Sequence, residues 1–157
     1  MTLRMQTLEL KIPPPVVALL VAVAMWELSR LAPLLDISAI VRATAAAIFA
    51  LAGAGLDIAG FVSFRRARTT INPLRPETTS SLVCSGIYRV TRNPMYLGLL
   101  LILTAWAIFL SCAWALSGPA AFVLYINRFQ IRPEERLLAG KFGTDYAAYA
   151  ARVRRWL

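Results

Sequence analysis

The stretch that decides the fold of this chain is Gly86–Gly98, which reads GIYRVTRNPMYLG and continues into the apolar segment Leu99–Leu110. A second polar cluster follows one apolar hairpin later, as RPEERL at Arg132–Leu137 and FGTDY at Phe142–Tyr146. A membrane hairpin returns the chain to the side from which it started, so both clusters should lie at one face. Polar side chains near a membrane are costly unless they bind something. The two clusters therefore predict a shared site.

The composition is typical of a membrane protein, because 59% of the 157 residues are hydrophobic and the mean hydropathy is +0.62. Soluble domains rarely have such a composition. Four apolar runs are expected to cross the bilayer, at residues 14–31, 40–64, 95–110 and 113–126. The first two have the roughly 20 residues that a ~30 Å hydrocarbon core requires, and the last two are shorter. We therefore predict an all-α fold, a multi-pass bundle of about four spans in a single domain over residues 1–157, with the last two spans as a tight hairpin.

The hairpin turn has two candidate positions, Ser111-Cys112 and Ser117-Gly118-Pro119. With the first of these turns, Pro119 lies inside the fourth helix and should kink it. The tail at residues 132–157 is expected to form interfacial helices that pack as an amphipathic segment. Pro133 suits the first position of the first of these helices, and Gly143 suits its end.

The distribution of positive charge predicts the orientation. Fifteen of the seventeen Lys and Arg residues fall on one side of this map, and the exceptions are Arg30 and Arg42. Lys and Arg concentrate on the cytoplasmic side. Both termini, the loop at residues 65–94 and the tail are therefore expected in the cytoplasm, at a bacterial inner membrane or the endoplasmic reticulum. The net charge of +9 suits membrane lipids as partners rather than nucleic acid, and a chain without histidine is a poor candidate for a zinc or haem site.

Several residues stand out as candidates for chemistry. Arg92 and Asn93 are presented at the start of the third helix, because Pro94 pushes the residue before it towards an extended conformation. Asp57 lies inside the second span, where an ionisable residue is functional or internally paired. Glu134 and Glu135 have two interpretations. They suit the first turn of a helix, where the dipole favours acids, and they also suit a clamp for a ligand ammonium group.

Together these motifs resemble the membrane-embedded isoprenylcysteine carboxyl methyltransferases and phospholipid N-methyltransferases. The family pattern is Gly-x-Tyr-Arg, Arg-His-Pro-x-Tyr-x-Gly, a hairpin, Glu-Glu-x-x-Leu and Phe-Gly-x-x-Tyr-x-x-Tyr. It corresponds here to residues 86–89, 92–98, 134–138 and 142–149, and the resemblance extends from about Thr69 to Trp156. One departure concerns the family's histidine, which is Asn93 here. Because the chain contains no histidine, imidazole base catalysis is excluded.

The resemblance implies methyl transfer from S-adenosylmethionine to a lipophilic small molecule or lipidated substrate at the cytoplasmic face, such as an isoprenylcysteine-like carboxylate or a phospholipid amine. It implies that the donor is bound by residues of the helix start and the two glutamates, namely Arg92, Asn93, Pro94, Tyr96, Leu97, Gly98, Glu134 and Glu135. We expect Glu135 and Arg132 to be catalytic, and Asp57 and Tyr146 to bind the substrate. We also expect Gly98→Leu to block donor binding without unfolding the bundle.

Two other interpretations of the sequence stay open. Membrane sterol reductases, which use NADPH, look similar in their cofactor region. A non-catalytic membrane partner protein that kept the fold is the third possibility, and the absent histidine gives it some weight.

Overall fold

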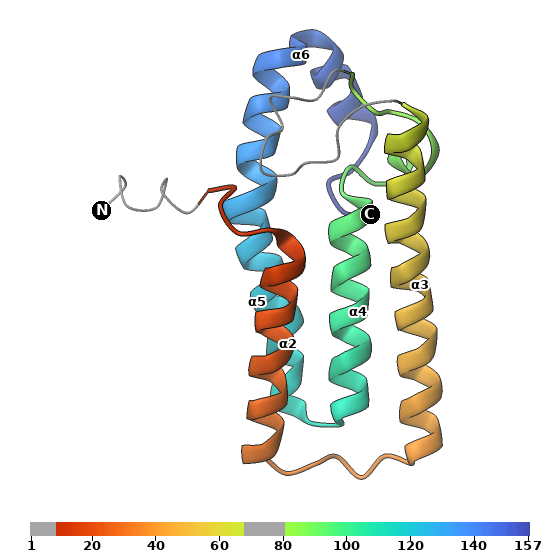
Figure 1. Cartoon of the computed structure of the whole chain (residues 1–157), viewed down its shortest axis with the longest axis vertical. Helices are drawn as coiled ribbons and strands as arrows, with labels where there is room; N and C mark the ends of the chain where they lie inside the picture. The colour runs from red at the N-terminus through yellow and green to blue at the C-terminus, as the bar shows by residue number, and fades with distance from the viewer. Residues whose placement is uncertain (1–8, 68–80) are drawn as a thin grey trace, which may run out of the picture.

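The computed structural model describes residues 9–67 and 81–157, and its regular elements are helical (Figure 1). In chain order they are α2 (Pro14–Leu31), α3 (Ala39–Arg66), the 3-10 helix η2 (Gly86–Arg89), α4 (Pro94–Leu110), the 3-10 helix η3 (Ala113–Leu116), α5 (Ser117–Ile126), the π-helix η4 (Asn127–Ile131) and α6 (Arg132–Arg152). No strand occurs within these two ranges, which confirms the all-α prediction. Part of the predicted loop 65–94, including Thr69, lies outside the described residues.

Within the described ranges, α2 and α3 are long and apolar enough to cross a membrane, whereas α4 is apolar but has only 17 residues. The bounds of α2 match the predicted span, and α3 slightly exceeds the predicted 40–64. Large apolar side chains cover their outer surfaces, since Leu19 is 63% and Leu51 is 74% exposed. Such a surface is unfavourable in water and suits contact with lipid tails. The number of passes and their orientation stay predictions.

The turn between the third and fourth apolar runs lies at Ser111. This residue ends α4 with a left-handed backbone (φ 51°), and its amide donates to the carbonyl of Ile108 at 3.1 Å. The side chain of Ser111 donates to the carbonyl of Leu35 at 3.0 Å, which ties the hairpin turn to the α2–α3 connection. The alternative turn at Ser117-Gly118-Pro119 is wrong, because these residues begin α5. Pro119 is the third residue of α5, which directly continues the 3-10 helix η3. The kink expected at Pro119 stays a prediction.

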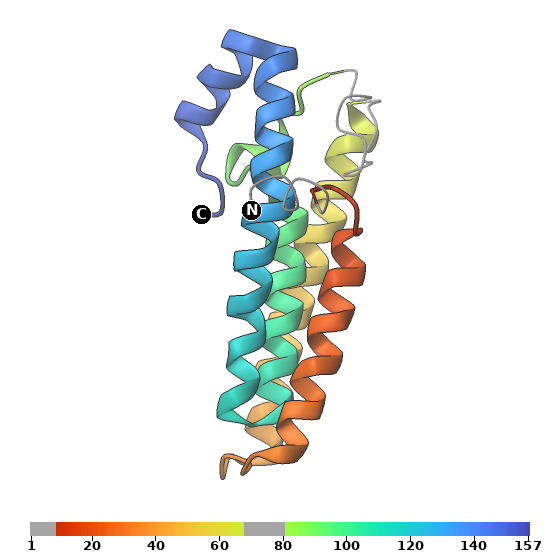
Figure 2. The same cartoon turned by 90° about the vertical axis from the view of Figure 1, so that its left-hand side faces the viewer.

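A continuous helix replaces the expected break between the fourth span and the tail. The three elements α5, η4 and α6 follow one another directly, and Figure 2 shows one long rod that continues into the first part of α6 before the chain turns back. Ile131, the residue before α6, has helical φ and ψ of −64° and −49°. Pro133, Glu134 and Glu135 do lie in the first turn of α6, as predicted, but this turn continues the π-helix η4 and does not start from a free helix end. A helix dipole at a free N-terminus does not explain these two carboxylates.

Pro133 accounts for the local geometry at η4. A proline inside a helix has no N–H for the carbonyl four residues earlier, and its ring crowds that carbonyl. The carbonyl in question belongs to Phe129, and it accepts a hydrogen bond from the amide of Leu10 at 3.0 Å instead. The buried side chain of Gln130 adds a bond from Nε2 to the carbonyl of Ile12 at 2.7 Å. The π-helix thereby binds the segment that precedes α2.

The chain reverses at Gly143, whose φ is 49° and ψ is −118°. A positive φ favours glycine, because glycine has no Cβ to clash with the backbone, and the predicted stop at Phe142–Gly143 is confirmed. The residues that follow form a short helix that turns back towards the bundle (Figures 1 and 2) and buries Tyr146 and Tyr149.

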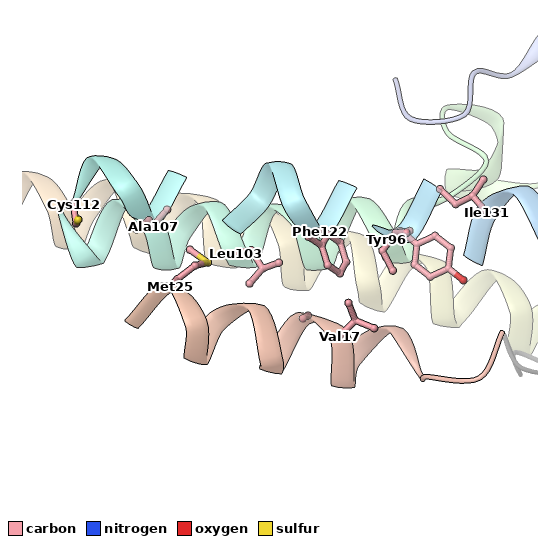
Figure 3. Packing of buried hydrophobic residues seen from close by; sticks show 11 residues of the cluster. Val17, Met25, Tyr96, Leu103, Ala107, Cys112, Phe122 and Ile131 are labelled. Atoms are coloured by element: carbon pink, nitrogen blue, oxygen red, sulfur yellow. The ribbon is translucent and has the colours of Figure 1, made fainter. Parts of the chain in front are cut away.

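The hydrophobic core lies between α2, α4 and α5, as Figure 3 shows from close by. Met25 of α2, Leu103 of α4 and Phe122 of α5 are 1%, 2% and 0% exposed. Gly118 permits the close approach of α5 to α2, because a Cβ at this position would meet the side chain of Met25. The core therefore closes the hairpin onto the first helix.

Helix α3 packs against α4 through glycines and contributes no residue to the buried core cluster. A Cβ on Gly53 would lie 2.6 Å from the carbonyl oxygen of Gly98 and 2.9 Å from the side chain of Ile102. A Cβ on Gly98 would in turn meet the carboxylate of Asp57 and lie 2.8 Å from the carbonyl oxygen of Gly53. The two backbones therefore touch, which fixes the position of α3 and of its acidic residue.

This crossing predicts opposite effects for two glycines of α3. Gly53→Ala places a methyl group against backbone atoms and should destabilise the fold by about 1–3 kcal/mol. Gly55→Ala is the control, because a Cβ there meets nothing within 4 Å, and it should stabilise the helix by about 0.5–1 kcal/mol. Thermal unfolding in detergent measures both effects. Equal stability of the two variants would contradict the crossing.

Candidate functional site

A cavity of about 670 Å³ lies at the end of the bundle where α4 begins. Apolar side chains such as Phe61, Leu99 and Ile131 form most of its wall. The charged and amide groups on the wall are Asp57, Arg92, Asn93, Glu134 and Glu135, and four phenols join them, those of Tyr88, Tyr96, Tyr146 and Tyr149. A large apolar pocket with a few convergent polar groups is the usual form of a small-molecule site. The two polar clusters of the sequence thus meet at one cavity.

The start of α4 is bound to the last residues of the chain. The amide of Arg92 donates to the carbonyl of Arg154 at 3.0 Å, and the side chain of Asn93 donates from Nδ2 to the carbonyl of Arg155 at 2.9 Å. The buried hydroxyl of Thr91 donates to the same carbonyl of Arg155 at 3.3 Å. Pro94 takes the first helical position, where its missing N–H is not needed. The segment after α6 therefore holds the start of α4 in place.

Glu134 and Tyr96 form a hydrogen-bonded pair across the cavity. The phenol of Tyr96 on α4 donates to Oε1 of Glu134 on α6 at 2.5 Å. Burial raises the pKa of Glu134 from 4.5 to about 8; the hydrogen bond from Tyr96 opposes this rise, and the charge of Glu135 adds to it. Glu134 is therefore largely protonated at neutral pH and exchanges its proton in the range where enzymes operate.

Glu135 is held between two arginines. Arg155 donates to it from Nε at 3.0 Å and from Nη2 at 2.5 Å, and Nη2 of Arg92 lies 3.2 Å from the same carboxylate. Arg92 also donates from Nη1 to the phenol oxygen of Tyr146 at 3.2 Å. Because both oxygens of Glu135 are occupied by guanidinium groups, a clamp for a ligand ammonium group is not favoured here.

The arginine cluster is suited to an anion instead. Two guanidinium groups face one carboxylate, so the cluster formed by Arg92, Glu135 and Arg155 keeps one positive charge in excess. The Nε atom of Arg92 is buried and has no hydrogen-bond partner in the part of the chain that the structure describes. Guanidinium donors of this kind bind carboxylate and phosphate groups.

Asp57 lies on the opposite side of the cavity, on α3. Its Oδ1 atom is buried and finds no hydrogen-bond partner among residues 9–67 and 81–157. The neighbouring wall is apolar, with Ile58 and Phe61 on the same helix. A buried carboxylate oxygen without a partner is unfavourable by itself. The arrangement is therefore complementary to a ligand that carries a donor or a positive charge.

Four of the predicted site residues do not line the cavity, namely Pro94, Leu97, Gly98 and Arg132. Leu97 is buried in the packing of α4, and Arg132 is exposed. Gly98 faces α3 rather than a ligand, since a Cβ there would meet Asp57. The expectation that Gly98→Leu tests donor binding without unfolding is therefore corrected, because this change would separate α3 from α4.

Sequence reasoning missed three residues of this site. Arg155, in the basic segment at the end of the predicted tail, pairs with Glu135. Tyr88 and Tyr149 line the cavity and bind each other, since the phenol of Tyr149 donates to the carbonyl of Tyr88 at 2.8 Å. The three-residue spacing of Tyr146 and Tyr149 was a usable signal, because it places both phenols on one helix face. No comparable signal marked Arg155 among its basic neighbours.

Comparison with known proteins gives two findings. Residues 41–145, more than half of the chain, match the family model described as "Phospholipid methyltransferase". An "Uncharacterized protein" of Haemophilus influenzae is 52% identical over 63 residues, which are 40% of this chain and all of that protein. No solved structure matches the chain. The residues matched by the family include Asp57, the start of α4 and both glutamates of α6.

The raised pKa of Glu134 predicts a pH dependence of stability. A carboxyl group that binds its proton more tightly in the folded state stabilises the fold below about pH 4.5, and this contribution is lost as the pH rises through about 8. At about 1.4 kcal/mol per pKa unit, the loss is on the order of 5 kcal/mol. Glu134→Gln should therefore unfold with a weaker pH dependence between pH 5 and 9 than the wild type.

The measurement is the melting temperature in detergent across this pH range. Glu27→Gln serves as the control, because Glu27 is an exposed partner of Arg30 away from the cavity, and it should keep the wild-type profile. A Glu134→Gln profile parallel to that of the wild type would show that Glu134 is not buried as described.

Proposed function

The chain belongs to the phospholipid methyltransferase family, and from that premise we propose that it transfers a methyl group from S-adenosylmethionine to an amine of a lipophilic acceptor. The reaction is placed in the cavity between α3, α4 and α6. Asp57 carries the choice of an amine, because it lines the cavity beside apolar side chains and its buried Oδ1, which lies against Gly98 of α4, lacks a hydrogen-bond partner in the described structure.

The residues present fit S-adenosylmethionine. Its carboxylate suits the cluster of Arg92, Glu135 and Arg155, which has a positive charge in excess and a buried N–H donor to spare. The apolar wall excludes water, which limits hydrolysis of a reactive donor. When bound, the donor supplies a methyl group on a positively charged sulfur that needs no further activation. The main contribution of this chain is then to align the acceptor with that group.

The acceptor end of the cavity is defined by Asp57 and its apolar neighbours. A negative carboxylate in surroundings of low dielectric attracts an ammonium group and repels an anionic acceptor such as a carboxylate. Ile58 and Phe61 supply apolar contacts for the hydrocarbon part of the same molecule. A phospholipid amine therefore suits this wall better than an isoprenylcysteine-like carboxylate does.

An amine has to lose its proton before it attacks, because its ammonium form has no free electron pair. The chain has no histidine to accept this proton. Asp57 and Glu134 are the lining carboxylates that no arginine neutralises within the described ranges. Glu134, with its pKa of about 8, is largely protonated at neutral pH, so it accepts a proton only in its ionised form, whose share rises towards pH 8.

The first test of this proposal concerns the donor. Arg92→Gln removes a charged hydrogen-bond donor worth about 1.5–3 kcal/mol, so S-adenosylmethionine should bind at least tenfold more weakly. Arg89→Gln is the matched control, because Arg89 is exposed on the neighbouring 3-10 turn and does not line the cavity. Calorimetric titration of purified protein with S-adenosylmethionine and, separately, NADPH measures both affinities. Binding of NADPH alone would overturn the proposal in favour of a reductase.

The second test concerns the acceptor. Asp57→Asn keeps the shape of the side chain and removes its charge, so kcat/KM for phosphatidylethanolamine should fall by roughly ten- to a hundredfold. The affinity for S-adenosylmethionine should stay unchanged. Asp36→Asn, in the exposed connection between α2 and α3, is the control. Methyl incorporation into lipid is the readout, and undiminished turnover by Asp57→Asn would contradict the role given to this carboxylate.

A further inference from the structure

A second hollow lies at the opposite half of the bundle. Helices α2 and α3 both pack on α4 but make few contacts with each other. Between them lies a groove of about 570 Å³ with almost wholly apolar walls. This groove shares no residue with the cavity described above. It therefore needs an explanation of its own.

The walls of this groove are shaped by small and flat side chains. Four alanines of α3, at positions 43, 46, 47 and 50, form one wall over about 10 Å of helix. The stacked rings of Trp106 and Phe109, with centroids 5.7 Å apart, form part of the α4 side. Trp106 is fixed in place because its Nε1 donates to the carbonyl of Ala22 at 3.0 Å. The result is an open groove lined by small and flat side chains.

The groove opens to the outside of the bundle. Leu19 on one wall is 63% exposed and Phe109 on another is 51% exposed. Both helices that flank it are the ones long and apolar enough to cross a membrane. The groove therefore faces lipid, and an apolar chain fits it better than water does, since it offers water few hydrogen-bond partners.

One end of the groove carries a guanidinium group. Arg42 lies one residue before Ala43 and four before Ala46, on the same side of α3 as these groove-lining alanines. Its Nη1 donates to the carbonyl of Phe109 at 3.3 Å, but its Nε is buried and has no hydrogen-bond partner in the described ranges. The ion pairs found among the described residues do not include Arg42, whereas nearby Arg30 pairs with Glu27 at 3.7 Å.

We propose that this groove binds a phospholipid of the surrounding bilayer, with one acyl chain along the alanines of α3 and its phosphate on Arg42. The guanidinium group lies near the end of a membrane-crossing helix, which is the level at which phosphate groups occur. Arginine binds phosphate through several N–H donors at once. The phosphate would give the Nε of Arg42 a hydrogen-bond partner, and the acyl chain would fill the apolar groove.

A second copy of the chain is the competing occupant, and the charges disfavour it. The spanning helices α2 and α3 contain only Glu27 and Asp57 as acidic residues. Glu27 is already paired with Arg30, and Asp57 lies on the wall of the other cavity. A second copy therefore has no carboxylate to offer Arg42 from within these helices, and its exposed Asp36 lies in the connection between them, outside the groove. A phospholipid carries its phosphate beside the acyl chain that would fill the groove.

Native mass spectrometry of the delipidated full chain tests the proposal. The probes are dioleoyl phosphatidic acid and dioleoylglycerol, which share their acyl chains and differ in the phosphate. The wild type should bind the phospholipid about tenfold more tightly, as expected for one charged hydrogen-bonded contact. Arg42→Gln should lose this preference, and Arg30→Gln, at the same end of the bundle, should keep it.

A second variant tests whether the groove holds the acyl chain. Ala46→Phe fills the groove and should reduce binding of both lipids at least severalfold. Retention of the phosphate preference by Arg42→Gln would overturn the proposal, and so would undiminished binding by a folded Ala46→Phe variant. The same spectra report the mass of the protein. A wild-type dimer that Ala46→Phe converts to monomer would assign the groove to a second copy instead.

Discussion

The end of the bundle that holds the cavity is organised by a hydrogen bond that Pro133 cannot make. Away from water, a backbone carbonyl without a donor costs free energy comparable to a lost hydrogen bond. The carbonyl of Phe129 loses its helical donor in this way, and it accepts a hydrogen bond from the amide of Leu10 instead. The helix can then continue through a π-turn and place both glutamates of α6 over the mouth of α4. The same contact holds the segment before α2 at the site, where Pro13, Pro14 and Pro15 form part of the cavity wall.

A second set of contacts works from the other end of the chain. The residues after α6 return to the mouth of α4, where their carbonyls accept hydrogen bonds from Arg92 and Asn93. This return places the guanidinium of Arg155 on Glu135, opposite that of Arg92. The charge excess of the cluster therefore depends on a segment that is far from α4 in sequence. The cavity is a product of both ends of the described chain closing over one helix start.

The sequence predicts what depends on local pattern and misses what depends on distant partners. The bounds of α2 follow from its apolar run, and the turn at Ser111 is one of the two positions that the sequence leaves open. The continuity of η4 with α6 does not follow from the sequence, because Pro133 and two glutamates have the signature of a free helix start, and the contact to Phe129 comes from the distant residue Leu10. Gly98 is similar. Its lack of a side chain is visible in the sequence, but whether a ligand or Asp57 occupies the space is decided by the packing of α3.

These contacts explain what the asparagine at position 93 does. The resemblance places a histidine there, and asparagine in its place lacks a titratable ring that could act as a base. In this structure the side chain donates from Nδ2 to the carbonyl of Arg155 at 2.9 Å and so holds the returning segment. A neutral imidazole has one N–H donor that can serve the same purpose, and an amide supplies it without titrating. Position 93 is thus explained by a positioning role, and in the reaction proposed above a proton would go to Asp57 or to ionised Glu134, the lining carboxylates that pair with no arginine in the described ranges.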